Sequence, residues 1–305
     1  METAELNVVT GAFSYTGRYI AQRLLSMGEE VRTLTGRPDH ENPFGYQVSA
    51  SPFNFDSPNQ LTNSLQGATT LYNTYWVRFS HGQVTFDKTV ENSKTIITAA
   101  EEAGIRRIVH ISITNPSEDS PFPYFRGKAL VERAITQSKL SYAIIRPTVI
   151  FGPKGILINN IAWLLRRFPI FAITGSGDYR IQPVFVEDVA EIAVNAGHSN
   201  ENTVIDAVGP EIYRFDELVR LIASKINSRA KIIHVGPRLA LFLANFIGYM
   251  VRDLVITKDE IEGLMSNLLV SESPPTSQTH LSEWLEQNAG RVGASYISDL
   301  KRHYR

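Results

Sequence analysis

The sequence predicts an α/β protein: a doubly wound parallel sheet joined to a smaller, mainly helical C-terminal domain. Two observations lead to this fold class. Short apolar runs alternate with amphipathic helical segments from residue 6 to about residue 200, an order typical of βαβ units. Beyond residue 208 the pattern changes to amphipathic helices with one short strand, so a different kind of domain is expected there.

The composition sets limits on function. The chain has 305 residues, 43% hydrophobic and 20% charged, which suits a soluble globular protein with a large core. A formal net charge of −1 gives no basic field for nucleic acid. The absence of cysteine excludes disulfides, thiolate nucleophiles and cysteine-ligated metals, and the seven scattered histidines suggest no metal site. No secretory signal is recognisable, so a cytoplasmic location is expected.

The chain opens on a strand, turn, helix and strand. An apolar run at Leu6–Val9 predicts the first strand, helical periodicity begins after Gly17, and Val31–Thr35 predicts the second strand. Gly28 suits the left-handed residue that closes a helix. The apolar positions of this helix recur at steps of four and three residues, at Ile20, Leu24 and Met27.

The turn between the first strand and the helix has the spacing Gly11-x-x-Ser14-x-x-Gly17. A helix N-terminus presents unpaired N–H groups and the positive end of the helix dipole, which attract a phosphate, and glycines allow a diphosphate to approach. Ser14 replaces the usual second glycine and could offer its hydroxyl instead. A tight turn without a ligand is the alternative. The residues predicted to bind the cofactor here are Gly11, Phe13, Ser14, Tyr15, Thr16 and Gly17.

The end of the second strand bears on the choice of cofactor. A carboxylate is expected there if the pocket holds the free ribose hydroxyls of NAD, but no acidic residue occurs between Val31 and Pro38. Arg32 and Arg37 occur instead, and Arg37 is well placed to meet a 2′-phosphate. NADP is therefore preferred over NAD, with a solvated loop arginine as the alternative.

Further candidate residues follow the next two predicted strands. Asp56 follows a short strand pattern and could bind the adenine amino group or cap the helix that starts at Pro58. Asn73 follows the strand Ala68–Tyr72 and is assigned to the cofactor. Aromatic residues are dense in the segment 74–79, where they could form a wall for the nicotinamide or substrate, or simply cover the sheet.

A tyrosine and a lysine form the candidate catalytic pair. A helix is expected over Gln83–Ala103 and a strand over Arg107–Ser112, and Tyr124 and Lys128 then lie four residues apart, on one face of a helix. A carbonyl reduced by hydride needs a proton on its oxygen. A nearby ammonium group would bring the pKa of a phenol, ordinarily about 10, closer to working pH.

Five segments carry a resemblance to a known family. They read VVTGAFSYTG, EEAGIRRIVHISIT, YFRGK, IIRPTVIFGP and GDYRIQPVFVEDVAE, and they span roughly residues 6–200. The chain resembles the extended or atypical branch of the short-chain dehydrogenase/reductases, the NAD-dependent epimerase/dehydratase group, which has a Rossmann fold. Within this group it looks most similar to members like the NADPH-binding accessory subunit of respiratory complex I.

The resemblance implies roles for individual residues. Tyr124 and Lys128 would be the catalytic pair and Thr114 the serine/threonine that holds the carbonyl oxygen. Ser112 and Pro147 would lie beside the cofactor. Ser14 and the short interval from Thr114 to Tyr124 depart from the sugar-nucleotide epimerases of the group. The domains are expected to be 1–150 with 176–208 for NAD(P), and 151–175 with 209–305 for the substrate or a lid.

The later part of the chain adds helices and one hydrophobic segment. Helices are predicted over Ile156–Arg167 and Phe215–Ile226 and a strand over Lys231–Val235. The run from Thr174 to Ala190 predicts a hairpin-like stretch, then a strand and the start of a helix. The apolar run within Pro237–Val255 is too short to span a bilayer and predicts a domain-packing or dimer helix, with peripheral membrane contact left open.

Two shorter C-terminal features complete the pattern. Thr257-Lys-Asp-Glu260 reads as a capping box, and a helical tail that is basic at its end follows the linker Ser271–Ser277.

Three functions fit these observations. The first is an NAD(P)-dependent oxidoreductase or epimerase that acts on a carbonyl or sugar-nucleotide-like small molecule, with Tyr124 as acid/base. The second is an NADPH-binding structural or assembly protein without turnover. The third is a redox-sensing protein that binds a partner. A homodimer is left open in all three.

Overall fold

A computed structural model describes residues 5–38 and 41–303, and these divide into two compact units. Unit 1 takes the residues up to Pro147 together with Val186–Asp206. Unit 2 takes Thr148–Phe185 and the residues from Ala207 on.

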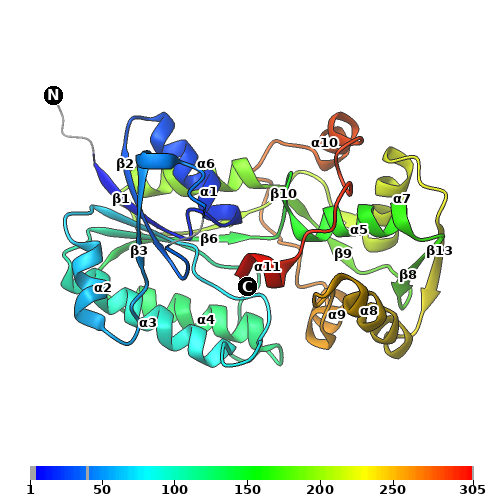
Figure 1. Cartoon of the computed structure of the whole chain (residues 1–305), viewed down its shortest axis with the longest axis horizontal. Coiled ribbons are helices and arrows are strands. Elements are labelled where there is room, and N and C mark those ends of the chain that lie inside the picture. Colours follow the sequence, from blue (N-terminus) through cyan, green and yellow to red (C-terminus); the bar gives the residue numbers. More distant parts are fainter. Residues whose placement is uncertain (1–4, 39–40, 304–305) are drawn as a thin grey trace. The chain divides into compact units, whose positions relative to one another are not determined.

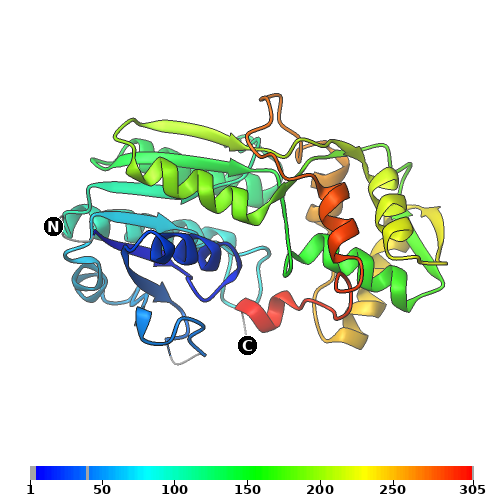
Figure 2. The ribbon, with the colours of Figure 1, turned by 90° about the horizontal axis from the view of Figure 1, so that it is seen from above.

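Unit 1 contains a seven-stranded sheet in the order β11-β6-β5-β4-β1-β2-β3. Every neighbouring pair from β6 to β3 is parallel. Figure 2 shows β2 and β3 (blue) on one side of β1, and β6 and β11 (green) on the other. The strands are β1 (Leu6–Thr10), β2 (Glu30–Thr35), β3 (Val48–Pro52), β4 (Thr70–Asn73), β5 (Arg107–Ile111), β6 (Ser141–Pro147) and β11 (Thr203–Ala207).

Helices cover both faces of this sheet, as a doubly wound fold requires. Helices α1 (Tyr15–Ser26) and α6 (Val186–His198) pack together on one face (Figure 1). The other face carries α2 (Pro58–Leu65), α3 (Phe86–Glu102) and α4 (Pro123–Thr136). A short 3-10 helix, η1 (Gly45–Gln47), precedes β3. The predicted α/β fold with a Rossmann-type sheet is confirmed.

The strand order reverses between β1 and β4. The chain runs outward through β2 and β3 on one side and through β4, β5 and β6 on the other. In open α/β sheets a ligand binds beyond the carboxyl ends of the strands at this point. The residues that end these strands, Thr10 and Asn73, therefore mark where a site is expected.

Helix α1 begins earlier than the periodicity predicted. Tyr15 is its first residue and Gly17 lies inside its first turn, whereas the apolar pattern placed the start after Gly17. Apolar periodicity detects a helix only where its side chains reach the core, and the first turn here carries half-buried Tyr15 and Thr16.

Unit 2 contains three small two-stranded sheets, β10-β7, β12-β9 and β13-β8. Their strands are β7 (Val149–Phe151), β8 (Ile170–Thr174), β9 (Arg180–Ile181), β10 (Pro183–Phe185), β12 (Tyr213–Arg214) and β13 (Lys231–Val235). Residues 176–185 were assigned from the sequence to the first domain, yet they lie in unit 2. The reason is strand pairing: β9 pairs with β12 and β10 with β7, so no β9–β10 hairpin forms.

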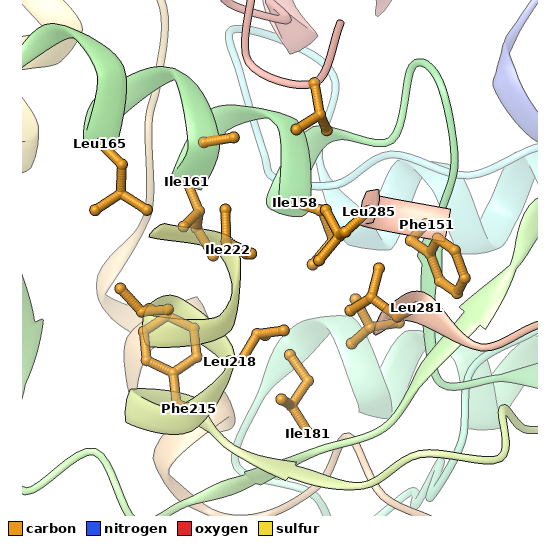
Figure 3. Close-up of a cluster of buried hydrophobic side chains, with 14 of the residues drawn as sticks. Phe151, Ile158, Ile161, Leu165, Ile181, Phe215, Leu218, Ile222, Leu281 and Leu285 are labelled. Atoms are coloured by element: carbon orange, nitrogen blue, oxygen red, sulfur yellow. The ribbon is translucent and has the colours of Figure 1, made fainter. Parts of the chain in front are cut away.

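The core of unit 2 is a cluster of buried aliphatic and aromatic side chains. Figure 3 shows Ile158, Ile161 and Leu165 facing Leu218 and Ile222. The helices of this unit are α5 (Ile156–Arg167), α7 (Phe215–Lys225), α8 (Pro237–Val251), α9 (Lys258–Met265), α10 (Leu281–Asn288) and α11 (Asp299–His303).

Two C-terminal predictions have different outcomes. The capping box is confirmed, because the Thr257 hydroxyl accepts from the Glu260 N–H at 3.1 Å and the Thr257 N–H donates to Glu260 at 2.8 Å. The tail is helical only in α10 and α11, since Gly293 between them has φ +70°. None of the described helices has the length and apolar character needed to cross a membrane.

Candidate cofactor and active site

The turn between β1 and α1 is so tight that neither of its glycines, Gly11 and Gly17, can be replaced without strain. The Gly11 N–H donates to the carbonyl of Leu34 at 2.7 Å, and the Ser14 N–H donates to the carbonyl of Gly11 at 2.8 Å. A Cβ at Gly17 would lie 2.4 Å from the Gly11 carbonyl oxygen, and Gly11 itself has φ +67°. Both positions therefore require glycine.

The donor groups of this turn fit a diphosphate. Ser14 is the N-cap of α1 but makes no side-chain cap hydrogen bond, and the first turn of α1 contains no acidic residue. The N–H groups of the first turn of α1 could therefore receive an anion, with no acidic side chain in that turn to compete. The other predicted contacts surround it: Phe13 lies against Phe44, Tyr15 against Tyr19, and Thr16 is half-buried.

The two candidate arginines, Arg32 and Arg37, have different surroundings. Arg32 is engaged within the fold, because its guanidinium donates to the carbonyls of Ser64 at 2.9 Å and Gln66 at 3.3 Å. Arg37 follows β2, where its N–H donates to the Thr35 hydroxyl at 3.2 Å. The contact of Arg37 with a 2′-phosphate stays a prediction.

Asp56 lies four residues beyond the end of β3 and is exposed. The N-cap of α2 is the next residue, Ser57, which makes no side-chain cap hydrogen bond. The proposed capping role of Asp56 therefore has no support in the geometry, and its adenine role stays a prediction.

Asn73 ties three strands together and is fully buried. Its side-chain oxygen accepts from the Thr10 hydroxyl at 3.2 Å and from the Tyr75 N–H at 3.1 Å, and its amide nitrogen contacts His110 Nδ1 at 3.2 Å. The Asn73 side chain thus fixes the carboxyl ends of β1, β4 and β5. Its predicted contact with the cofactor stays a prediction.

Lys128 lies on α4 and is only 2% exposed. Its ammonium nitrogen donates to the carbonyl of Ile111, at the end of β5, at 2.7 Å. Burial lowers the pKa of Lys128 to about 7, while the Glu132 carboxylate acts in the opposite direction. His110 is fully buried nearby, and burial together with the charge of Lys128 holds the pKa of its imidazole well below the usual value. Lys128 therefore supplies positive charge at this site, and its protonation changes near neutral pH.

Tyr124 and Lys128 meet at the ring of Trp76. The Lys128 ammonium lies 4.6 Å from the Trp76 ring centroid, and the Tyr124 ring is edge-on to it at 5.8 Å. A Cβ at Gly127, between the pair, would come within 2.8 Å of the same indole. The aromatic segment after β4 thus divides: Trp76 packs on α4, whereas Tyr75 packs on Phe53 and Phe55.

The two candidate hydroxyls differ in their surroundings. Ser112 donates to Glu132 at 2.5 Å, and Glu132 also accepts from Arg146 at 3.0 and 2.5 Å, so the Ser112 hydroxyl is already used. Thr114 is joined to Pro147 through its N–H at 3.0 Å, and its buried hydroxyl has no hydrogen-bond partner among the described residues. An unsatisfied buried hydroxyl implies a further partner such as a ligand or water.

Glu132 is the residue that the motif analysis missed. It connects β5, α4 and β6 through Ser112 and Arg146, and it stands four residues after Lys128, on the same helix. The spacing Tyr124, Lys128, Glu132 was visible in the sequence. What it could not show was that Arg146, on a different element, lies against this carboxylate.

Comparisons with known proteins concern the fold and the cofactor class. Residues 11–155 match a family model described as NAD(P)H-binding. The chain is 24% identical over 284 residues to NADH dehydrogenase [ubiquinone] 1 alpha subcomplex subunit 9 of Arabidopsis thaliana, covering 87% of this chain and 71% of the relative. It is 26% identical over 209 residues to the (4-alkanoyl-5-oxo-2,5-dihydrofuran-3-yl)methyl phosphate reductase of Streptomyces griseus, covering 67% and 68%.

Among solved structures, the triphenylmethane reductase of Citrobacter sp. complexed with NADP(H) superposes with a TM-score of 0.74. Its sequence is 17% identical, and the alignment covers 93% of this chain and 99% of that one. This likeness concerns the fold alone. Together, the family match and the relatives confirm the predicted resemblance to the extended or atypical short-chain dehydrogenase/reductases, and residues 11–155 of this chain are similar to an NAD(P)H-binding domain.

Proposed function

We propose that this chain is an NAD(P)H-dependent oxidoreductase that reduces a carbonyl group of a small molecule. The observation that carries the proposal is the grouping of Tyr124, Lys128 and Trp76, with the Lys128 ammonium 2.7 Å from the carbonyl at the end of β5. That grouping stands at the strand ends where an open α/β sheet binds its ligands. Two of the similar proteins are named as reductases, which supports the same reaction class.

The residues would divide the reaction as follows. When bound, NAD(P)H would supply the hydride, with its electron pair, that reduces the carbonyl carbon. The hydroxyl of Thr114 donates a hydrogen bond to the carbonyl oxygen, and Tyr124 gives that oxygen its proton. The charged form of Lys128 stabilises the phenolate that Tyr124 becomes once it has given up its proton. A sugar-nucleotide-like substrate would use the same residues with the direction of transfer reversed.

The cofactor assignment within this proposal is NADP. Arg37 follows β2, no acidic residue stands between Val31 and Pro38, and Arg32 is occupied by two carbonyls. Gly11, Ser14 and Gly17 would hold the diphosphate, and Ser112 and Pro147 would lie close to the nicotinamide. The cytoplasmic location stays a prediction, and the complex I relative is named as a mitochondrial protein.

The test is turnover by Tyr124→Phe. With NADPH and a panel of quinones, aldehydes and unsaturated lactones, we expect the wild-type chain to oxidise NADPH and the variant to lose roughly 10²–10⁴-fold in kcat, as removal of a general acid predicts. NADPH binding by the variant should stay within about twofold, because the residues proposed to hold the diphosphate, Gly11, Ser14 and Gly17, are unchanged. Full activity of Tyr124→Phe on an identified substrate would sink the assignment.

A second candidate is a cofactor-binding accessory protein without turnover. The observation in its favour is the similarity to a complex I subunit, which covers 87% of this chain. The packing of Trp76 against Tyr124 and Lys128 fits either candidate. Under this alternative NADPH binds tightly, no member of the panel is reduced, and the cofactor instead stabilises unit 1. If this alternative is right, the Trp76→Ala variant should reduce no member of the panel, like the wild type. If the chain is an enzyme, Trp76→Ala should change the KM for the substrate.

A further inference from the structure

Helix α8 of unit 2 exposes large apolar side chains that a globular protein normally buries. Only two of its residues are buried, Ala244 and Gly248. Single exposed apolar residues are common, but a continuous apolar stripe marks an interaction surface. The exposed fractions along the stripe are 49% for Leu239, 68% for Phe242, 59% for Phe246, 87% for Tyr249 and 56% for Met250.

These five residues, which we name the α8 stripe, lie on one side of the helix. With 100° of rotation per residue they fall within an arc of about 100°. On the opposite side lie the two buried residues of the helix, Ala244 and Gly248, and α8 contacts β8 of unit 2. The buried side, rather than the stripe, therefore faces unit 2.

The charges on helix α8 and at its ends are positive. Helix α8 contains no acidic residue, and the exposed Arg238 and Arg252 stand at its two ends. Neither arginine forms an ion pair with any described residue. The neighbouring carboxylate, Asp253, is buried and accepts from the N–H groups of Asp299 at 2.9 Å and Leu300 at 3.1 Å, so it does not face the stripe.

This charge pattern favours a lipid surface over a second copy of the chain as the partner of the stripe. In a two-fold pair of α8 helices, either Arg238 meets Arg252 of the other copy or each arginine meets its own equivalent, so like charges face one another in both orientations. An anionic lipid surface accepts both guanidinium groups while the apolar side chains enter the acyl boundary, and tyrosine favours that boundary.

We propose that the α8 stripe docks this protein on an anionic lipid surface, with Phe242 and Phe246 inserted and Arg238 and Arg252 on the headgroups. Unit 1 plays no part in this contact, so its test does not depend on the oxidoreductase proposal. Binding is peripheral because α8 is too short to span a bilayer.

The experiment is flotation of the full chain with two kinds of vesicle. One consists of phosphatidylcholine alone, and the other also contains about 30% phosphatidylglycerol, which gives a negative surface potential. We expect binding to the anionic vesicles, weakened by salt. Phe242→Gln with Phe246→Gln should lower the partition coefficient by roughly a hundredfold, about tenfold for each phenylalanine. Arg238→Gln with Arg252→Asn should lower it by at least about tenfold on anionic vesicles and leave the neutral ones unchanged.

Matched controls keep the result specific. Asparagine is chosen at position 252 because Arg252 has φ +53°, which asparagine tolerates. Ile212→Gln, a 49% exposed apolar residue of unit 2 outside α8, should bind as the wild type does. Far-ultraviolet circular dichroism and thermal unfolding confirm that each variant is folded. Absence of flotation with either vesicle would overturn the proposal, as would a wild-type dimer that the double phenylalanine variant converts to monomer.

Discussion

At the scale of single residues, the buried ammonium of Lys128 makes stability depend on pH. Its pKa is about 7 in the fold and 10.5 in a free lysine. Between these values the unfolded chain binds more protons than the folded chain, so the free energy of unfolding should rise with pH, by up to about 1.4 kcal/mol per unit. Lys128→Met should flatten this rise.

The measurement is urea denaturation of the chain without cofactor at pH 7, 8 and 9 (about the window between the two pKa values). The wild type and Lys128→Met are compared at each pH, so that other titrating groups cancel. Lys139→Met replaces an exposed lysine and should keep the wild-type slope. Equal slopes for the wild type and Lys128→Met would show that Lys128 keeps an ordinary pKa.

Glu132 and Glu118 offer a comparison between a buried and an exposed ion pair. The Glu132 side chain is 8% exposed and pairs with Arg146, whereas Glu118 is 40% exposed and pairs with Arg133, each at 2.5 Å. We expect Glu132→Gln to cost about 1–3 kcal/mol of unfolding free energy, since Arg146 loses its partner. Glu118→Gln should cost less than about 1 kcal/mol.

A second readout separates Glu132 from a purely structural residue. Its carboxylate raises the pKa of Lys128, so Glu132→Gln should move the pH dependence of stability to lower pH. Chemical denaturation at several pH values measures both effects. Equal losses of unfolding free energy in Glu132→Gln and Glu118→Gln would show that the buried ion pair stabilises the fold no more than the exposed one.

Residue types and spacing predicted which side chains gather at the site, but not which are already engaged. Ser112 and Thr114 look equivalent in the sequence, two hydroxyls after one strand. Only the fold shows that Ser112 is taken by Glu132, twenty residues later, while the hydroxyl of Thr114 has no partner among the described residues. Partners from distant segments leave no local signal.

At the scale of elements, the turn between β1 and α1 depends on a close backbone approach. We expect Gly17→Ala to destabilise the chain by about 1–3 kcal/mol, because its methyl group would stand 2.4 Å from the Gly11 carbonyl oxygen. It should also weaken NADPH binding, since the turn must open. Gly290→Ala, in unit 2, is the control: nothing lies within 4 Å of its Cβ and its φ is not positive. Isothermal titration and denaturation measure the two quantities, and normal NADPH affinity in Gly17→Ala would contradict the phosphate site.

Elements with a regular apolar period were predictable and the irregular ones were not. The helix Ile156–Arg167 and the strand Lys231–Val235 have the bounds that their patterns predicted. The stretch that contains β9 and β10 looked like a hairpin because its two short strands are close in sequence. Each instead pairs with a strand from a distant segment, a choice made by tertiary packing.

At the scale of the whole molecule, the chain divides at points that hydrophobic patterns mark only loosely. The chain passes between the units three times, after Pro147, before Val186 and after Asp206. The first and last crossings lie within three residues of the boundaries predicted at 150 and 208. The second was predicted ten residues too early, at 176 instead of 186, because β9 and β10 pair with strands of unit 2.

The cofactor preference is also a property of the whole molecule, because binding to the folded chain raises its unfolding temperature. At about 100 times its Kd, NADPH should raise that temperature by roughly 5–10 °C. NADH at the same concentration should raise it less, because it lacks the 2′-phosphate that Arg37 would meet. Arg37→Glu should reverse the order, since a carboxylate repels the phosphate and accepts from ribose hydroxyls.

Hydrogen exchange on the same samples shows where the cofactor acts. NADPH should slow exchange in the peptides that contain Gly11–Gly17 and Leu34–Arg37, and Arg37→Glu should lose the second effect while it keeps the first. The diphosphate turn and the ribose position lie on neighbouring strands, β1 and β2, so one ligand can protect both. Equal stabilisation of the wild type by NADH and NADPH would instead mean that Arg37 does not read the 2′-phosphate.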